Sequence, residues 1–267
     1  MDQVDTGLPD NHGAELPAIS RLTEADLRAA LAAGWADFKA APIYGLFFAA
    51  VYTLGGLALY FWMLGATDPF WFVPIAAGFP LFAPFAAVGL YEVSRRREAG
   101  EPLTWGPILG ALRGQGDGQL PVMGVVVLIV FGFWVILARG IFAIFFAQSG
   151  VGFDSVSHVF TLPGVGMVLV GGVVGGVMAL ALFAITVFSL PMLLHRPVDF
   201  VTAIITSVSA VNGNRAVMLR WAAIIAGLMI VAMIPAFLGL LVVLPVLGHA
   251  TWHLYRRTIA ESPATAG

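Results

Sequence analysis

Apolar residues are gathered in long stretches separated by short polar segments, and this pattern predicts membrane-spanning helices. A helix needs about 20 apolar residues to cross about 30 Å of hydrocarbon. The last stretch, from Ala216 to Tyr255, is about twice that length, so it must cross twice. We expect its turn between Pro235 and Gly239, because proline ends a helix and glycine permits a reversal. The four earlier stretches, each long enough for one span, are 43–64, 70–91, 120–147 and 164–194.

A short segment with a helix-start signal precedes each pair of spans. In the first, Thr23 can cap a helix with Asp26 three residues later. Arg28, Asp37 and Lys39 face away from its apolar stripe. We interpret the unit as a cytoplasmic interfacial helix followed by a transmembrane hairpin. The three units could form a true threefold repeat. The same spacing also arises without a repeat in membrane proteins that have basic cytoplasmic loops. The apolar stripes are Leu27, Leu31, Gly34, Trp35 and Phe38; Trp105, Ile108, Leu109 and Leu112 after Thr104; and Phe200, Ala203, Ile204, Val208 and Val211 after Asp199.

Lys and Arg are distributed unevenly between the two ends of the predicted spans, and this sets the orientation. Twelve of the thirteen lie at one end, and only Arg139 is left for the other. Basic segments are poorly translocated and collect in cytoplasmic loops. We therefore predict an all-α polytopic membrane protein with six transmembrane helices as three hairpins and both termini cytoplasmic. Its parts are a cytoplasmic N-terminal segment with an amphipathic helix (1–42), a six-span domain (43–257) and a cytoplasmic tail (258–267).

Composition agrees with this prediction and excludes other classes. Hydrophobic residues make up 60% of the chain and charged residues 10%, against about 45–50% and about 25% in ordinary globular domains. The net charge of −2 argues against nucleic acid as a partner. The absence of cysteine excludes disulfides, thiolate metal sites and thiol catalysis. Lys39 is the one lysine among the basic residues, which is typical of a GC-rich bacterial genome and indicates a bacterial inner membrane.

Catalytic and ion-coupling motifs are missing from the predicted spans. None of the fifteen acidic residues falls in the middle of a span, whereas ion-coupled transport usually needs a carboxylate or an unwound polar helix there. The chain also has no Walker loop, no Gly-x-Ser-x-Gly elbow and no His-Glu-x-x-His zinc motif. We therefore expect a protein that is not an enzyme.

Three histidines are the candidates for a metal or haem site. His249 and His253 are four residues apart and share one helix face near the cytoplasmic end of the last span, and His195 lies at a similar depth. In the alternative interpretation they belong to an interfacial belt with Trp252 and Tyr255. No carboxylate lies on the same helix face within reach of the pair to orient the imidazoles, so we favour the belt and expect no cofactor.

Two further features of the spans have alternative interpretations. Arg139 is either a buried cation that pairs with a polar group or binds an anion, or a side chain that extends toward the outer interface; we favour the second. Gly171, Gly172, Gly175 and Gly176 form two overlapping small-x-x-x-small pairs, which let a neighbouring backbone approach. For these glycines we favour packing inside the bundle over dimerisation.

Several short segments carry a family resemblance. Together they resemble a family of alphaproteobacterial integral membrane proteins that is filed as a domain of unknown function, with a similarity that extends from about Leu16 to Arg257. Some members are labelled cytochrome c oxidase subunit I. An oxidase core would hold haem through histidines buried in its spans, and this chain has no histidine at mid-depth, so we expect at most association with a respiratory complex. The segments are LPAI at 16–19, YGL at 44–46, GFPL at 78–81, GLYEVSRR at 89–96, DFVTA at 199–203 and LPVLGHATWHLYRR at 244–257.

These observations favour a non-enzymatic inner-membrane protein with an accessory, assembly or membrane-organising role. Its expected partners are the lipid bilayer and either other inner-membrane subunits or a second copy of the chain. One alternative is a channel or an uncoupled transporter for a small solute. The other is a haem- or metal-binding subunit associated with a respiratory complex.

Overall fold

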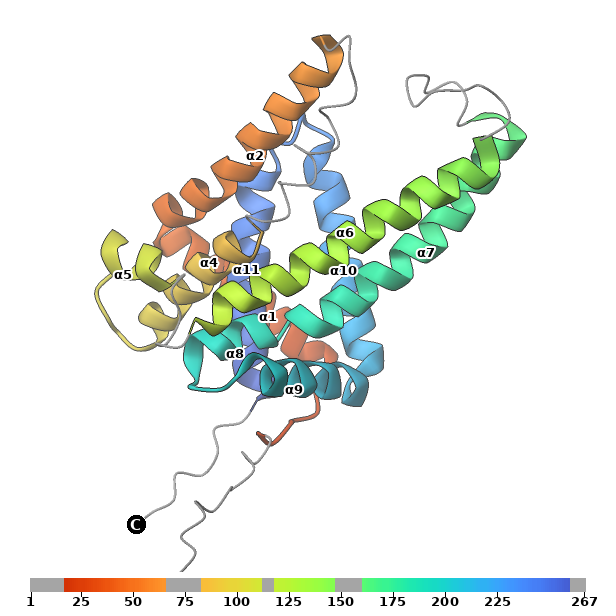
Figure 1. The fold of residues 1–267 in the computed structure, drawn as a ribbon. Helices are drawn as coiled ribbons and strands as arrows, with labels where there is room; N and C mark the ends of the chain where they lie inside the picture. The colour runs from red at the N-terminus through yellow and green to blue at the C-terminus, as the bar shows by residue number, and fades with distance from the viewer. Residues whose placement is uncertain (1–16, 66–82, 112–117, 147–159, 260–267) are drawn as a thin grey trace, which may run out of the picture.

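The computed structural model describes residues 17–65, 83–111, 118–146 and 160–259. Every regular element in these ranges is a helix, apart from one isolated antiparallel β-bridge between Ile19 and Ile259. The all-α class is therefore confirmed for the described residues (Figure 1). The helices are α1 (Glu24–Ala40), α2 (Pro42–Gly65), α4 (Ala83–Glu98), α5 (Trp105–Gly110), α6 (Gln119–Phe146), α7 (Leu162–Thr186), α8 (Ser189–His195), α9 (Phe200–Gly213), α10 (Arg215–Met233) and α11 (Leu240–Thr258).

Three of the described helices are long and apolar enough to cross a membrane. They are α6, α7 continued into α8, and α10. Helix α1 and the first part of α2 meet the same criteria together, but the chain bends by 100° between them, where Pro42 begins α2. Length and composition thus support three or four spans, and the six-span arrangement stays a prediction. The expected span 70–91 lies partly outside the described residues, and α11 is too mixed in composition to count.

The three predicted short helices are present as α1, α5 and α9. Asp26 accepts a hydrogen bond from the Thr23 backbone N–H at 2.9 Å, as expected for a capping box. Asp199 caps α9 by accepting from the backbone N–H groups of Val201 and Thr202, both at 2.9 Å. Local sequence signals therefore set the starts of α1 and α9.

The turn between α10 and α11 lies where the sequence predicted it, within residues 234–239. The glycine acts differently from the expectation, however. Ala236 and Phe237 take the positive φ values, 49° and 64°. Gly239 is needed for space, because a Cβ there would lie 2.6 Å from the Cα of Ala232. Glycine thus permits the close return of α11 along α10 and does not supply the left-handed turn.

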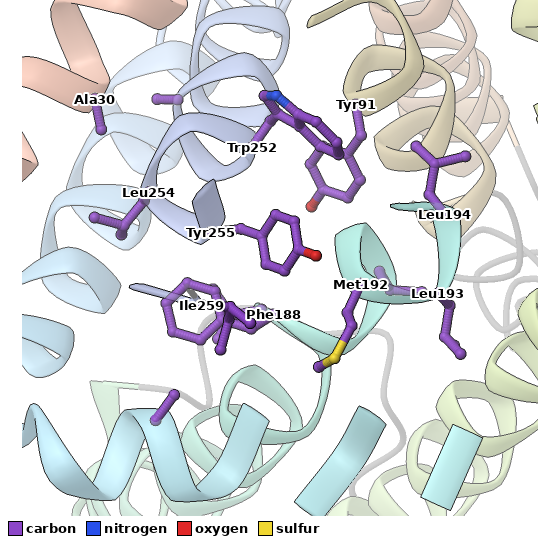
Figure 2. Close-up of a cluster of buried hydrophobic side chains, with 14 of the residues drawn as sticks. Ala30, Tyr91, Phe188, Met192, Leu193, Leu194, Trp252, Leu254, Tyr255 and Ile259 are labelled. Atoms are coloured by element: carbon purple, nitrogen blue, oxygen red, sulfur yellow. The ribbon is translucent and has the colours of Figure 1, made fainter. Parts of the chain in front are cut away.

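The main hydrophobic core lies where α1, α4, α8 and α11 meet. Figure 2 shows Trp252 and Tyr255 of α11 beside Phe188 and Met192, and all four side chains are fully buried. Gly34 of α1 contacts the backbone of α11, because a Cβ at this position would lie 2.6 Å from the Val246 carbonyl oxygen and the Ala250 nitrogen. These contacts make α11 the central helix of the structure.

Helices α6 and α7 form a separate, peripheral pair. In Figure 1 they run side by side away from the rest of the protein, and contacts between α6 and α7 hold them together. In the most apolar 18-residue segment of α6, only 17% of the residues are buried. In the corresponding segment of α7–α8, none is buried. The large apolar side chains of this pair therefore face outward, as expected for helices surrounded by lipid.

Candidate functional site: a buried polar cluster between α1, α4 and α11

The centre of the site is the carboxylate of Asp37, which is buried where α1 meets α4 and α11. Its Oδ1 accepts a hydrogen bond from Nε of Arg97 at 2.8 Å. Its Oδ2 accepts from the Ser94 hydroxyl at 2.7 Å and lies 2.8 Å from Nε2 of His253. We call Asp37, Ser94, Arg97, His249 and His253 the Asp37 cluster. Three helices thus share one buried carboxylate.

The hydrogen bonds of the cluster assign the tautomer of His249, which is fully buried. A carboxylate only accepts hydrogen bonds, so the single Ser94 proton points to Asp37. The Ser94 oxygen must then accept from Nδ1–H of His249, which is 2.8 Å away. In the neutral ring Nε2 carries the lone pair, and among the described residues it has no hydrogen-bond partner. By the same reasoning, His253 donates from Nε2–H to Asp37.

The charge of Asp37 is kept by its neighbours. Burial alone would raise the pKa of this carboxyl, because a low-dielectric interior disfavours the charged form. Hydrogen bonds from His253, Arg97 and Ser94 outweigh that effect and lower the pKa of Asp37 to about 2. The group is therefore an anion at neutral pH, and it is compensated on both of its oxygens.

Two further carboxylates on α4 extend the polar contacts around the cluster. Glu92 is buried and accepts from Nε of Arg95 and from Nε of Arg96, both at 2.7 Å. Glu98 accepts from the Trp252 indole at 2.9 Å and from Arg256 at 3.0 Å, which joins α4 to α11. Arg95 and Arg96 thus pair within α4, whereas Arg256, which the sequence assigned to the cytoplasmic side, joins two helix ends.

The structure separates the three candidate histidines. His249 and His253 meet at the Asp37 cluster, whereas Nδ1 of His195 is 3.1 Å from the Tyr255 hydroxyl and its ring packs edge-on against Trp252. Within the described ranges, no group of three or more His, Cys, Asp or Glu is arranged to hold a metal ion. The interfacial-belt interpretation is wrong for His249, Trp252 and Tyr255, because all three are buried in the protein core.

Asp37 is the site residue that sequence reasoning missed, because the apolar stripe of α1 placed it on a polar face. The buried face instead runs through Leu27, Ala30 and Gly34 to Asp37, and includes Phe38. The positions 30, 34 and 37 follow helical spacing, and small residues there let α11 approach closely. That small-residue stripe was the signal that could have identified Asp37.

The other predicted features lie on the peripheral pair. Arg139 is exposed on the surface of α6. Gly175 packs against the α6 side chain of Trp134, since a Cβ would lie 2.8 Å from the indole. The remaining glycines of the motif, Gly171, Gly172 and Gly176, face open space and, with Gly175, line an apolar hollow of about 450 Å³ beside Trp134 and Phe131.

These features define the class of the protein as an α-helical integral membrane protein, with apolar helices and a polar cluster near the helix ends. Comparison with known families gives the same class: residues 72–195 match the model of the family described as "Predicted integral membrane protein (DUF2189)". The match contains Ser94 and Arg97 but not Asp37, His249 or His253. The matched range is shorter than the expected one, which extends from about Leu16 to Arg257. The function of the family is unknown. No curated protein and no solved structure matches the chain.

Proposed function

We propose that this protein is a non-enzymatic accessory, assembly or membrane-organising protein of a bacterial inner membrane. The observation that carries the proposal is the peripheral α6–α7 pair, whose apolar surface is left uncovered by the other described residues. Lipid covers such a surface by default, and glycine-rich helix faces in lipid are the ones that allow a second helix to pack closely. The proposed partners are therefore another membrane subunit, including one of a respiratory complex, or a second copy of the chain.

The Asp37 cluster supports a structural role for α1, α4 and α11, which lie apart from the α6–α7 pair. Its carboxylate is engaged by donors from two other helices, and Glu92 and Glu98 are likewise paired with arginines. A polar network whose charges are paired in this way makes the packing of its helices specific and rigid. Such a core can hold the peripheral pair at a fixed angle for a partner.

The two ends of the described chain support a topology with both termini on one side of the membrane. Ile19 and Ile259 form an antiparallel bridge, and the Ser20 N–H donates to the Thr258 carbonyl at 2.8 Å. Neighbouring ends require an even number of crossings. The positive-inside rule then places this side in the cytoplasm, and six spans as three hairpins satisfy both conditions.

Reporter fusions test the topology. A reporter that is active only outside the cytoplasm should give signal when fused after Gly152, and none when fused after Gly100 or Gly267. Gly152 and Gly267 lie outside the described residues, so the structure does not prejudge the result. Signal from the C-terminal fusion would contradict the six-span topology.

Photocrosslinking in cells tests the partner. A photoreactive residue at Val173 of α7, which is 68% exposed, should form an adduct with a specific membrane protein. The control is Ile230 of α10, which is 65% exposed and should report background contacts. Adducts with lipid alone at both positions would remove the basis of the proposal.

An absorption band of haem in the purified protein would replace the proposal with the haem-binding alternative.

A further inference from the structure

One face of α1 points away from the protein and is basic and aromatic. Arg28, Trp35 and Lys39 lie seven and four residues apart, so they project from the same side of the helix. All three side chains are exposed, and the Trp35 indole is 44% exposed. The Lys39 ammonium lies 5.8 Å from the centre of that ring. We call these three residues the α1 basic face.

The acidic residues of α1 do not neutralise this face, because each is engaged by a cation of another helix. Glu24 pairs with Arg220 of α10. Asp26 lies 3.2 Å from Arg257, and Asp37 is held in the cluster by Arg97. Among the described residues, Arg28 and Lys39 have no carboxylate partner. The α1 basic face therefore presents two uncompensated positive charges.

The location of the face fits the membrane boundary. Lys39 stands just before the 100° bend into α2, and the outward side of α2 is apolar from Ile43, 61% exposed, to Leu54, 65% exposed. Tryptophan and lysine at the start of an apolar span are typical of the headgroup region. The expected stripe is wrong at Trp35, which lies on the side of Arg28 and Lys39, whereas Phe38 is buried. Trp35 alone therefore supplies the aromatic contact.

We propose that the α1 basic face binds the phosphates of anionic phospholipid headgroups in the adjoining leaflet. The planar guanidinium of Arg28 can donate two hydrogen bonds to one phosphate, and the Lys39 ammonium binds as a point charge. Trp35 packs among the headgroups between them. The inference goes beyond the proposed function. It rests on the proposed topology in one respect only, which is that the adjoining leaflet is the cytoplasmic one.

The size of the effect follows from the two charges. A basic residue close to an anionic membrane surface contributes about 1 kcal/mol. Two such residues correspond to roughly a thirtyfold preference for anionic over zwitterionic lipid. The preference should fall as ionic strength rises, because exposed charges are screened by salt.

Native mass spectrometry of the full chain, released from nanodiscs of mixed phosphatidylglycerol and phosphatidylcholine, measures this preference directly. The wild type should retain phosphatidylglycerol, and the double variant Arg28→Gln/Lys39→Gln should lose roughly thirtyfold of the preference. The matched control Arg139→Gln/Arg215→Gln removes the same charge from exposed residues elsewhere. It should behave like the wild type.

Two results would overturn the proposal: a wild type without preference, or an equal loss in both double variants, which would indicate a general effect of charge. Thermal unfolding of each variant checks that the Asp37 cluster is intact. A second variant, Trp35→Ala, leaves the charges in place and should weaken the retention of phosphatidylglycerol less than the double variant does. The lipid result is independent of photocrosslinking at Val173, so the two proposals can fail separately.

Discussion

Helices α7 and α11 show opposite relations between apolar composition and burial. The most apolar window of α7–α8 has a mean hydropathy of 2.5, yet none of it is buried in the protein. Helix α11 carries two arginines and two histidines and is less apolar than the three candidate spans, yet Trp252, Leu254 and Tyr255 are fully buried. In lipid, burying apolar side chains between helices gives no hydrophobic free energy, because lipid tails are equally apolar. Polar contacts and small residues therefore determine which helices pack together. Hydropathy therefore marks contact with lipid, and mixed composition marks the protein core.

The largest expected effect comes from removing the carboxylate at the centre of the core. Asp37→Ala removes the buried acceptor that Arg97, His253 and the fully buried Ser94 hydroxyl share, and losing these hydrogen bonds to a charged group should cost about 3 kcal/mol of the free energy of unfolding. The control Glu24→Ala breaks an exposed ion pair with Arg220 and should cost at most about 1 kcal/mol. Thermal or chemical unfolding in detergent compares the two variants. Equal losses would show that the Asp37 cluster does not organise the core.

The second effect concerns the contact between α1 and α11. Gly34→Ala places a Cβ 2.6 Å from backbone atoms of Val246 and Ala250, and backbone cannot yield as a side chain can. We expect a loss of about 1–3 kcal/mol in the free energy of unfolding. In the control Gly132→Ala on α6, the new Cβ meets nothing within 4 Å. That variant should be neutral or slightly stabilised, because alanine favours helix.

A smaller effect is expected on the peripheral pair. Gly175→Ala places a Cβ 2.8 Å from the Trp134 ring, which can shift, so the free energy of unfolding should fall by about 1 kcal/mol. Gly171→Ala faces open space and should leave stability unchanged. If Gly171→Ala weakens crosslinking from Val173 while stability is unchanged, the hollow beside Trp134 is part of the partner surface. Equal destabilisation of both variants would mean that α7 is packed more tightly than the structure shows.

Local sequence signals predicted much of the fold. The capping residues Thr23 and Asp199 and the reversal after Pro235 lie where the elements begin or turn, because each depends on residues a few positions apart. The apolar stretch 120–147 likewise corresponds closely to α6. Such features need no knowledge of the neighbouring helices.

The polar cluster could not be predicted in the same way. Asp37, Ser94 and His253 are far apart in the chain, and their contact depends on how closely α1 packs against α11. Helix α11 carries no Asp or Glu of its own, and the carboxylate that pairs with His253 is on α1. The burial of Trp252 could not be predicted for a related reason: composition distinguishes a helix end from a span, but not a buried side chain from an interfacial one.

A double-mutant cycle between Asp37 and His253 tests the central claim most directly, because it measures whether α1 is held by α11 through the Asp37 cluster. The free energies of unfolding of Asp37→Ala, His253→Ala and the double variant should give a coupling energy of about 1–3 kcal/mol. A parallel cycle of Asp37→Ala with His195→Ala should be additive within about 0.5 kcal/mol, because His195 contacts Tyr255 instead. Additivity in both cycles would contradict the account and leave α1 held to α11 by its small-residue and apolar contacts alone.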